Sequence, residues 1–73
     1  MNPNNLRLKD FIRFLVSVGC KQIRHHDGHI VFTRHDLTRP IVVQDHIDPV
    51  PLRVIQSNLR TLGLTLKAIR DFE

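Results

Sequence analysis

The sequence has little of what secreted and membrane proteins rely on. It contains one cysteine, Cys20, among 73 residues, so it cannot form an internal disulfide. Its apolar runs are only a few residues long, whereas a transmembrane helix needs roughly 20. The N-terminal segment also lacks the basic, apolar and small-residue order of a signal peptide. A cytoplasmic protein without a membrane span is therefore expected.

The chain is also too short for a second domain. A chain of 73 residues buries only about 60% of the surface that its unfolded form exposes, which leaves enough for one small core. No internal repeat or low-complexity segment is visible. Residues 1–73 are therefore expected to form a single domain.

Acidic residues are scarce relative to basic ones. Seven Asp and Glu stand against eleven Lys and Arg, which gives a net charge of +4 and a pI near 10.2. Such a balance favours acidic partners, nucleic acid among them. Arginine outnumbers lysine, which suits forked contacts to phosphate groups.

Two segments show the three- and four-residue apolar spacing of amphipathic helices. They cover residues 8–18 and 52–62, and a glycine follows each of them at Gly19 and Gly63. Asp48 or Val50 is expected near the cap of the second helix.

The two ends of the chain have less regular patterns. Residues 1–7 have turn composition and are expected to be a loose N-terminal lead-in. Residues 64–73 are expected to contain a short C-terminal helix that begins after Thr65, with Ile69 or Phe72 touching the core.

Three β-strands are expected between the helices, at residues 20–26, 30–34 and 41–45. Asp27-Gly28 is a tight-turn signal, because glycine adopts a positive φ without a steric clash. The element order is then α-β-β-β-α, with the short C-terminal helix at the end. This predicts an α+β fold in which a three-stranded antiparallel sheet carries two helices on one face, the layout of double-stranded-RNA-binding domains.

His29 is the strongest candidate for a chemical role. It follows the Asp27-Gly28 turn directly, and Arg24, Arg34 and Arg39 are near it in the sequence. The reference pKa of histidine is near 6.5, so an imidazole can exchange protons at neutral pH. A proton-exchanging side chain among cationic side chains is what an enzyme acting on a phosphodiester needs.

The alternative for His29 is a strand histidine without any chemistry. Its sheet face is not determined by the pattern, because either Val31 or the pair Ile30 and Phe32 can point inward.

The pattern His-His-x-x-His at His25, His26 and His29 raises the question of a metal site. Neighbouring strand residues point to opposite faces, and no cysteine or carboxylate set completes a tetrahedral shell. Neither a metal nor another cofactor is expected.

Three segments follow motifs of one known family. Its first helix ends in Ala-Gly-Phe, where this chain has Val18-Gly19-Cys20, and its motif Gly-Ser-His-x-x-aromatic stands here as Asp-Gly-His-Ile-Val-Phe at residues 27–32. Its later helix, Thr-Leu-Arg-x-Ile-Leu-x-x-Leu-Gly-Leu, corresponds to residues 51–64. From about residue 9 to residue 64 the chain thus resembles the HicA family of RNA-cutting toxins, also described as YcfA-like proteins. It departs from the family in having Asp-Gly in place of the Gly-Ser pair.

The resemblance implies a toxin of a type II toxin-antitoxin system, a metal-independent endoribonuclease that cleaves mRNA and is neutralised by a HicB-like antitoxin. The matching motif makes His29 the catalytic residue. Arg24, Arg34 and Arg53 are the expected RNA contacts, and His46 is an accessory candidate. The free toxin is expected to be a monomer or a weak dimer.

Two other functions remain open from the sequence. One is a noncatalytic RNA-binding module of the same fold, which would grip phosphates through Arg53 and the loops. The other is a protein that only assembles with a partner. Arg53 and Arg60 lie seven residues apart and share one helix face, which is either solvated or in contact with RNA or an antitoxin.

Overall fold

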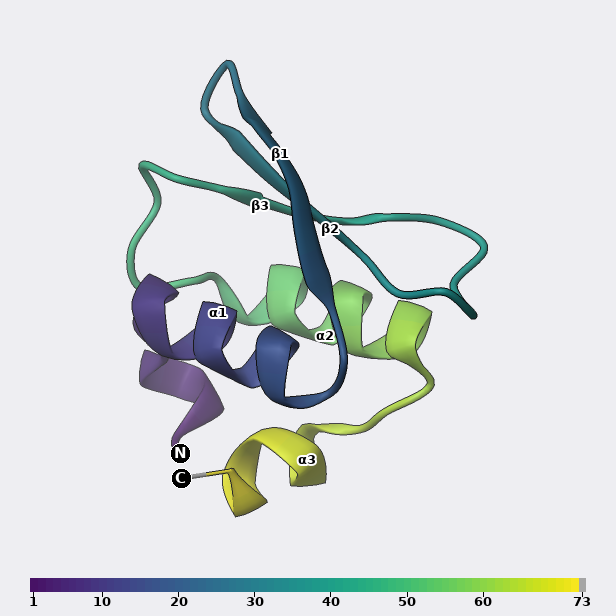
Figure 1. Cartoon of the computed structure of the whole chain (residues 1–73). Helices are drawn as coiled ribbons and strands as arrows, with labels where there is room; N and C mark the ends of the chain where they lie inside the picture. Colours follow the sequence, from purple (N-terminus) through teal and green to yellow (C-terminus); the bar gives the residue numbers. More distant parts are fainter. Residues whose placement is uncertain (73) are drawn as a thin grey trace.

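The chain folds into a sheet layer and a helix layer (Figure 1). The structure is a computed structural model and describes residues 1–72. Its elements are η1 (Pro3–Asn5), α1 (Leu8–Ser17), β1 (Lys21–His26), β2 (His29–Thr33), β3 (Ile41–Gln44), α2 (Leu52–Leu62) and α3 (Leu66–Asp71). The α+β class and the order of helices and strands expected from the sequence are confirmed.

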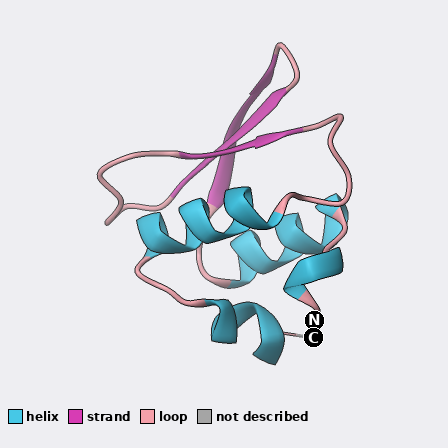
Figure 2. Ribbon diagram, turned by 180° about the vertical axis from the view of Figure 1, so that it is seen from behind, coloured by secondary structure: helices cyan, strands magenta, loops and turns pink. Residues whose placement is uncertain are grey.

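The sheet is an antiparallel meander with the strand order β1-β2-β3. Helices α1 and α2 lie side by side below it, and the shorter α3 lies on the far side of these two helices (Figure 1, Figure 2). Two helices therefore cover one sheet face, and no helix in residues 1–72 covers the other.

The turn between β1 and β2 sets the register of the hairpin. Asp27 has φ 52° and Gly28 has φ 79°, so both central residues are left-handed, as in a type I′ turn. His26 consequently pairs with His29 across the two-residue loop. The Asp-Gly signal thus predicted the hairpin correctly and places His29 at the first position of β2.

The inward-facing residues of the sheet are Ile30 and Phe32 of β2 and Ile41 and Val43 of β3. These side chains are at most 6% exposed and belong to the main apolar cluster with the helices. Since side chains alternate along a strand, His29 lies on the opposite, outer face. The pairing of His29 with Gln44 puts both of these exposed residues there.

Each long helix buries one apolar stripe against this sheet face. Phe11, Phe14 and Leu15 are the buried residues of α1, and α2 buries Ile55, Leu59 and Leu62 beside them. Gly63 ends α2 in the left-handed conformation at φ 73°, as the sequence predicted. Cys20 is 5% exposed within the same core, and this burial raises the pKa of its thiol.

Of the two residues expected near the cap of α2, Val50 directly precedes the N-cap residue, whereas Asp48 does not cap the helix. The N-cap of α2 is Pro51, and no side chain caps it. The Asp48 carboxylate instead accepts hydrogen bonds from the Arg7 guanidinium at 2.9 and 3.0 Å and from the Leu8 backbone N–H at 3.0 Å. It therefore satisfies a free N–H at the start of α1, from a loop that is distant in the sequence.

The expectation that residues 1–7 form a loose lead-in is wrong. Pro3 is buried, and Leu6 is 1% exposed and part of the core. The Met1 ammonium donates hydrogen bonds of 2.9 to 3.1 Å to the backbone oxygens of residues 69, 70 and 72 at the end of α3. A cation at the carbonyl end of a helix is favourable, and the core apolar residues hold the segment in place.

The C-terminal helix begins after Thr65, as expected, although no side-chain hydrogen bond caps it. Ile69 is fully buried, and the Phe72 ring meets the Phe14 ring edge to face at 5.5 Å between centroids. Both apolar residues expected to reach the core do so. Along residues 1–72, no helix has the length and apolarity to cross a bilayer.

We expect acid to weaken the junction between Asp48 and α1. The hydrogen bond from Arg7 lowers the pKa of Asp48 below its ordinary value of 3.8, and the Leu8 N–H adds to this. A carboxylate whose pKa is lower in the folded state stabilises the fold above its unfolded pKa and loses that contribution as the pH falls. As the pH is lowered from about 5 to about 2, the melting temperature should therefore fall less steeply for Asp48→Asn than for the wild type.

A matched control for this prediction is Asp71→Asn, which removes an exposed pair with Lys67 on α3. Exposed pairs of this kind contribute little to stability. If the melting temperature had the same dependence on pH in the wild type and in Asp48→Asn, the role assigned to Asp48 would be contradicted.

Candidate functional site

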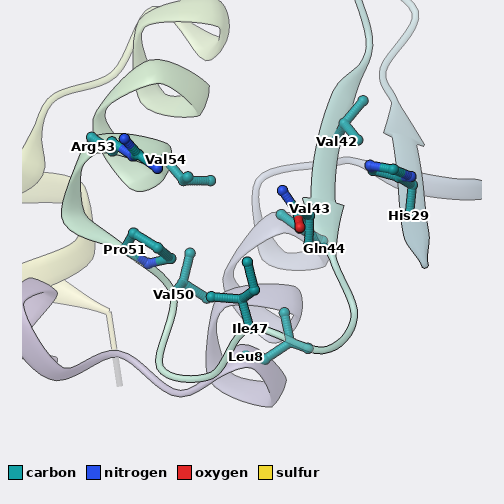
Figure 3. A pocket seen from close by; sticks show the side chains of 10 residues that line it. All are labelled: Leu8, His29, Val42, Val43, Gln44, Ile47, Val50, Pro51, Arg53 and Val54. Atoms are coloured by element: carbon teal, nitrogen blue, oxygen red, sulfur yellow. The ribbon is translucent and has the colours of Figure 1, made fainter.

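His29 is exposed and lies at the wall of a pocket between β3 and the start of α2 (Figure 3). The pocket has a volume of about 210 Å³. Its walls are mainly apolar, and the ionisable side chains among the described residues that line it are His29 and Arg53. The fold thus brings together two predicted site residues that are far apart in the sequence.

No other group holds the His29 imidazole. Within residues 1–72 it forms no hydrogen bond and no ion pair. Both ring nitrogens are therefore available to a ligand. The surrounding residues do not determine which tautomer is present.

Arg53 lies in the first turn of α2, on the side that faces β3. Its side chain lines the pocket of His29 and also the next hollow along the helix (Figure 3). Within the described chain its guanidinium has no ion pair or side-chain hydrogen bond. It is thus free to contact an anion.

The pocket continues into a longer groove, which we call the β3–α2 groove. A second hollow shares Val42, Arg53 and Val54 with the first, and a third shares Arg39, Ser57 and Thr61 with the second, so the three form one continuous depression. Beyond the His29 pocket, the polar side chains along it are Arg39, Arg53, Ser57, Asn58, Arg60, Thr61 and Thr38. No aspartate or glutamate of residues 1–72 lines it.

Arg39 and Arg60 therefore join Arg53 as candidate RNA contacts. From the sequence, Arg60 was left open between a solvated face and contact with RNA or an antitoxin, and Arg39 was noted only as a neighbour of His29. Arg39 comes from the loop before β3, and Arg60 from the last turn of α2. Their sequence positions are unremarkable, and only the helical spacing of Arg53 and Arg60 pointed to a shared face. The antiparallel course of β3 and α2 brings Arg39 to the same groove.

Arg24 lies on the outer sheet face on the other side of His29. It is exposed and pairs with Val31, which makes it a diagonal neighbour of His29 across the β1–β2 ladder. Its register is offset by an irregularity of β1 between Gln22 and Arg24. His29 is consequently flanked by one arginine on β1 and one on α2.

Arg34 is not part of this arrangement. It follows the far end of β2, roughly 16 Å along the strand from His29 at about 3.3 Å per residue. Its guanidinium donates to the Asp36 carboxylate at 2.6 and 3.1 Å and to the Val18 backbone oxygen at 2.8 Å. Its contacts join the β2–β3 loop to the end of α1.

We therefore expect Arg34→Gln to affect stability and not RNA affinity. The substitution leaves the Val18 oxygen and the Asp36 carboxylate without their cationic donor, so the melting temperature should fall. Anisotropy titration with labelled RNA should give an affinity within twofold of the wild type. A loss of RNA affinity as large as that of Arg53→Gln would restore Arg34 as a binding residue.

His46 lies beside the turn that precedes His29. A side-chain carbon at Gly28 would be 3.6 Å from His46 Nδ1, so the imidazole is close to the glycine backbone. The Asp45 carboxylate contacts His25 Nε2 at 2.7 Å and His46 Nδ1 at 3.5 Å, and the hydrogen bond with His25 lowers the pKa of Asp45. His46 is therefore near His29 but lies outside the pocket lining.

The histidines of the hairpin do not converge on one point. His25 pairs with the inward-facing Ile30, whereas His26 pairs with His29 on the outer face. In the described part of the chain, no group of three or more His, Cys, Asp or Glu side chains is placed to hold a metal ion.

The features that a function has to explain are thus an exposed imidazole, an unpaired arginine across the same pocket and a cationic groove leading away from both. No family model, curated protein or solved structure matches the chain.

Proposed function

We propose that the protein is a metal-independent endoribonuclease in which His29 is the catalytic acid and base. The observation that carries the proposal is the joint position of His29 and Arg53 at one pocket. It combines a proton-exchanging group with a cation that has no partner among residues 1–72. This is the pair of functions that cleavage of a phosphodiester requires.

In the proposed reaction, the His29 imidazole accepts the proton of a ribose 2′-hydroxyl. The 2′ oxygen forms a bond to the adjacent phosphorus, and the bond from phosphorus to the 5′ oxygen breaks. The departing 5′ oxygen takes a proton from a water molecule, and the protonated His29 imidazole then acts as an acid by returning its proton to the hydroxide that is left. Arg53 neutralises the extra negative charge on the phosphoryl oxygens as they pass through the five-coordinate state.

The biological setting we propose follows the resemblance to HicA toxins. The layout of the sheet and helices is compatible with the double-stranded-RNA-binding-domain type, and the chain would act on mRNA in the cytoplasm as the toxin of a type II system. A HicB-like antitoxin that is acidic would complement the net charge of +4 and cover the groove.

The direct test is incubation of the purified protein with RNA in excess EDTA. We expect discrete cleavage products, because no metal takes part in the proposed reaction. RNA that stays intact in EDTA and is cleaved only after a divalent metal is added would contradict this mechanism.

A second candidate is a noncatalytic RNA-binding module. The lack of any group in residues 1–72 that orients the His29 ring favours this candidate, since catalytic bases are commonly held by a further side chain. In that case a gel shift should show a complex with RNA that stays intact on long incubation.

A further inference from the structure

The β3–α2 groove extends from His29 in one direction only. From Gln44, the pairing partner of His29, to Arg39 the chain covers five residues, or about 17 Å at the rise of an extended strand. On the opposite wall, Arg53 and Arg60 are about 10 Å apart along the axis of α2. The three arginines are thus spaced along the groove and do not meet at one point.

The described side chains that line the groove include cationic groups and no anionic ones. Within residues 1–72, Arg39, Arg53 and Arg60 have no ion pairs, and the hydroxyls of Ser57 and Thr61 lie between them. A ligand that fits must carry negative charge at intervals. A sugar-phosphate backbone has this property, and forked guanidinium groups suit it.

The open edge of β3 adds backbone donors to the same groove. The Asp45 N–H donates to the Gly28 oxygen, so this pair is of the hydrogen-bonded type. In an antiparallel ladder the types alternate, which turns the N–H groups of Gln44 and Val42 away from β2. Val42 lines the groove at this edge.

Asn58 gives an independent sign of a ligand in the middle of the groove. It lines the central hollow, is only 8% exposed, and is the one buried polar residue of the described chain. Its amide nitrogen has no hydrogen-bond partner within residues 1–72. An unpaired buried donor is unfavourable, and rotation of the amide toward a bound acceptor would remove that cost.

We infer that the β3–α2 groove is a subsite for the backbone of single-stranded RNA on one side of the bond next to His29, with Arg39, Arg53 and Arg60 as its phosphate contacts. This rests on the proposed function for the choice of RNA. At the 3.4 Å spacing of a stacked strand, about 17 Å corresponds to about five nucleotides. The described groove lining has no Phe, so phosphates and not stacked bases dominate the affinity.

Salt dependence gives the sharpest test. Affinity for fluorescein-labelled oligouridylates of 2, 5, 8 and 12 nucleotides is measured by anisotropy, with the full chain carrying His29→Gln to prevent cleavage. Three phosphate contacts predict a slope of log affinity against log salt near about −2, at about 0.7 per contact. Affinity should rise steeply up to about five nucleotides and only slowly beyond that.

Arg39→Gln and Arg60→Gln should each weaken binding about fivefold at 0.1 M salt and reduce the slope by about 0.7. Arg70→Gln is the matched control, because it removes the same charge from α3, away from the groove (Figure 1). Asn58→Leu should fold at least as stably as the wild type and still bind RNA more weakly.

The outcomes separate this inference from the proposed function. If Arg39→Gln and Arg60→Gln bind RNA like Arg70→Gln while the wild type still cleaves RNA through His29, the subsite is wrong and the endoribonuclease stands. A duplex of equal length that binds as tightly as the single strand also overturns the subsite. If an acidic polyglutamate peptide binds the groove and RNA neither binds nor is cleaved, both proposals fail.

Discussion

Replacing His29 by alanine is expected to abolish RNA cleavage and leave the fold intact. General acid-base assistance by a histidine contributes about 10² to 10⁴ in rate, so residual cleavage should fall by at least a hundredfold. The side chain is exposed and makes no hydrogen bond within residues 1–72, so its loss should not change the melting temperature by more than about 4 °C.

The measurement is initial-rate cleavage of a labelled RNA in EDTA, together with thermal melting of each variant. His35→Ala is a matched control, since it removes another exposed histidine in the loop after β2, outside the groove. It should cleave at the wild-type rate. A folded His29→Ala chain that cleaves RNA at the wild-type rate would remove His29 from the mechanism.

The identity of the attacking group can be tested with the same assay. An RNA in which the ribose at the cleaved position is 2′-deoxy lacks the nucleophile of the proposed reaction and should stay intact. It should still bind with nearly the same affinity, since the groove contacts are to phosphates. Cleavage at the deoxy position would show that water attacks instead.

The second large effect is expected in the core, where Phe32→Ala should remove a large part of the free energy of unfolding. Phe32 of β2 is fully buried and belongs to the core cluster that also contains residues of both long helices. Truncation of a buried phenylalanine costs about 3 to 5 kcal/mol. A domain of 73 residues has a total stability of roughly 4 to 11 kcal/mol at the usual value per residue.

Urea denaturation followed by circular dichroism measures this effect as a shift of the midpoint. Ile23→Ala is the control within the same sheet, because Ile23 is 55% exposed in β1. Its truncation should change the free energy of unfolding by no more than about 0.5 kcal/mol. A Phe32→Ala chain as stable as the control would show that the inner face of the sheet had been assigned incorrectly.

Local signals in the sequence determined the elements well. Gly63 ends α2 because only a residue without a Cβ adopts the left-handed conformation at low cost, and the apolar stripe before it gives the helix bounds. Asp27 and Gly28 predicted the hairpin for the same kind of reason. Such signals act over a few residues, so they can be read without knowing what packs where.

Contacts between distant residues were much harder to predict. Asp48 was one of two residues expected near the cap of α2, but its carboxylate accepts hydrogen bonds from Arg7 and Leu8. The Met1 ammonium donates to backbone oxygens at the end of α3. Nothing in the local pattern relates these positions, because each contact depends on how the helices and loops pack. Arg34 was likewise expected to contact RNA, whereas in the structure its guanidinium donates hydrogen bonds to Asp36 and to the end of α1.

The sequence by itself determined the α+β order, the turn before His29 and the excess of positive charge. Tertiary structure alone decided that Ile30 and Phe32 point inward, which places His29 on the open face at the rim of the pocket that Arg53 also lines. The physical reason is that both sets of alternate residues in β2 are apolar enough to be buried. Only the packing of α1 and α2 against one face of the sheet selects between them.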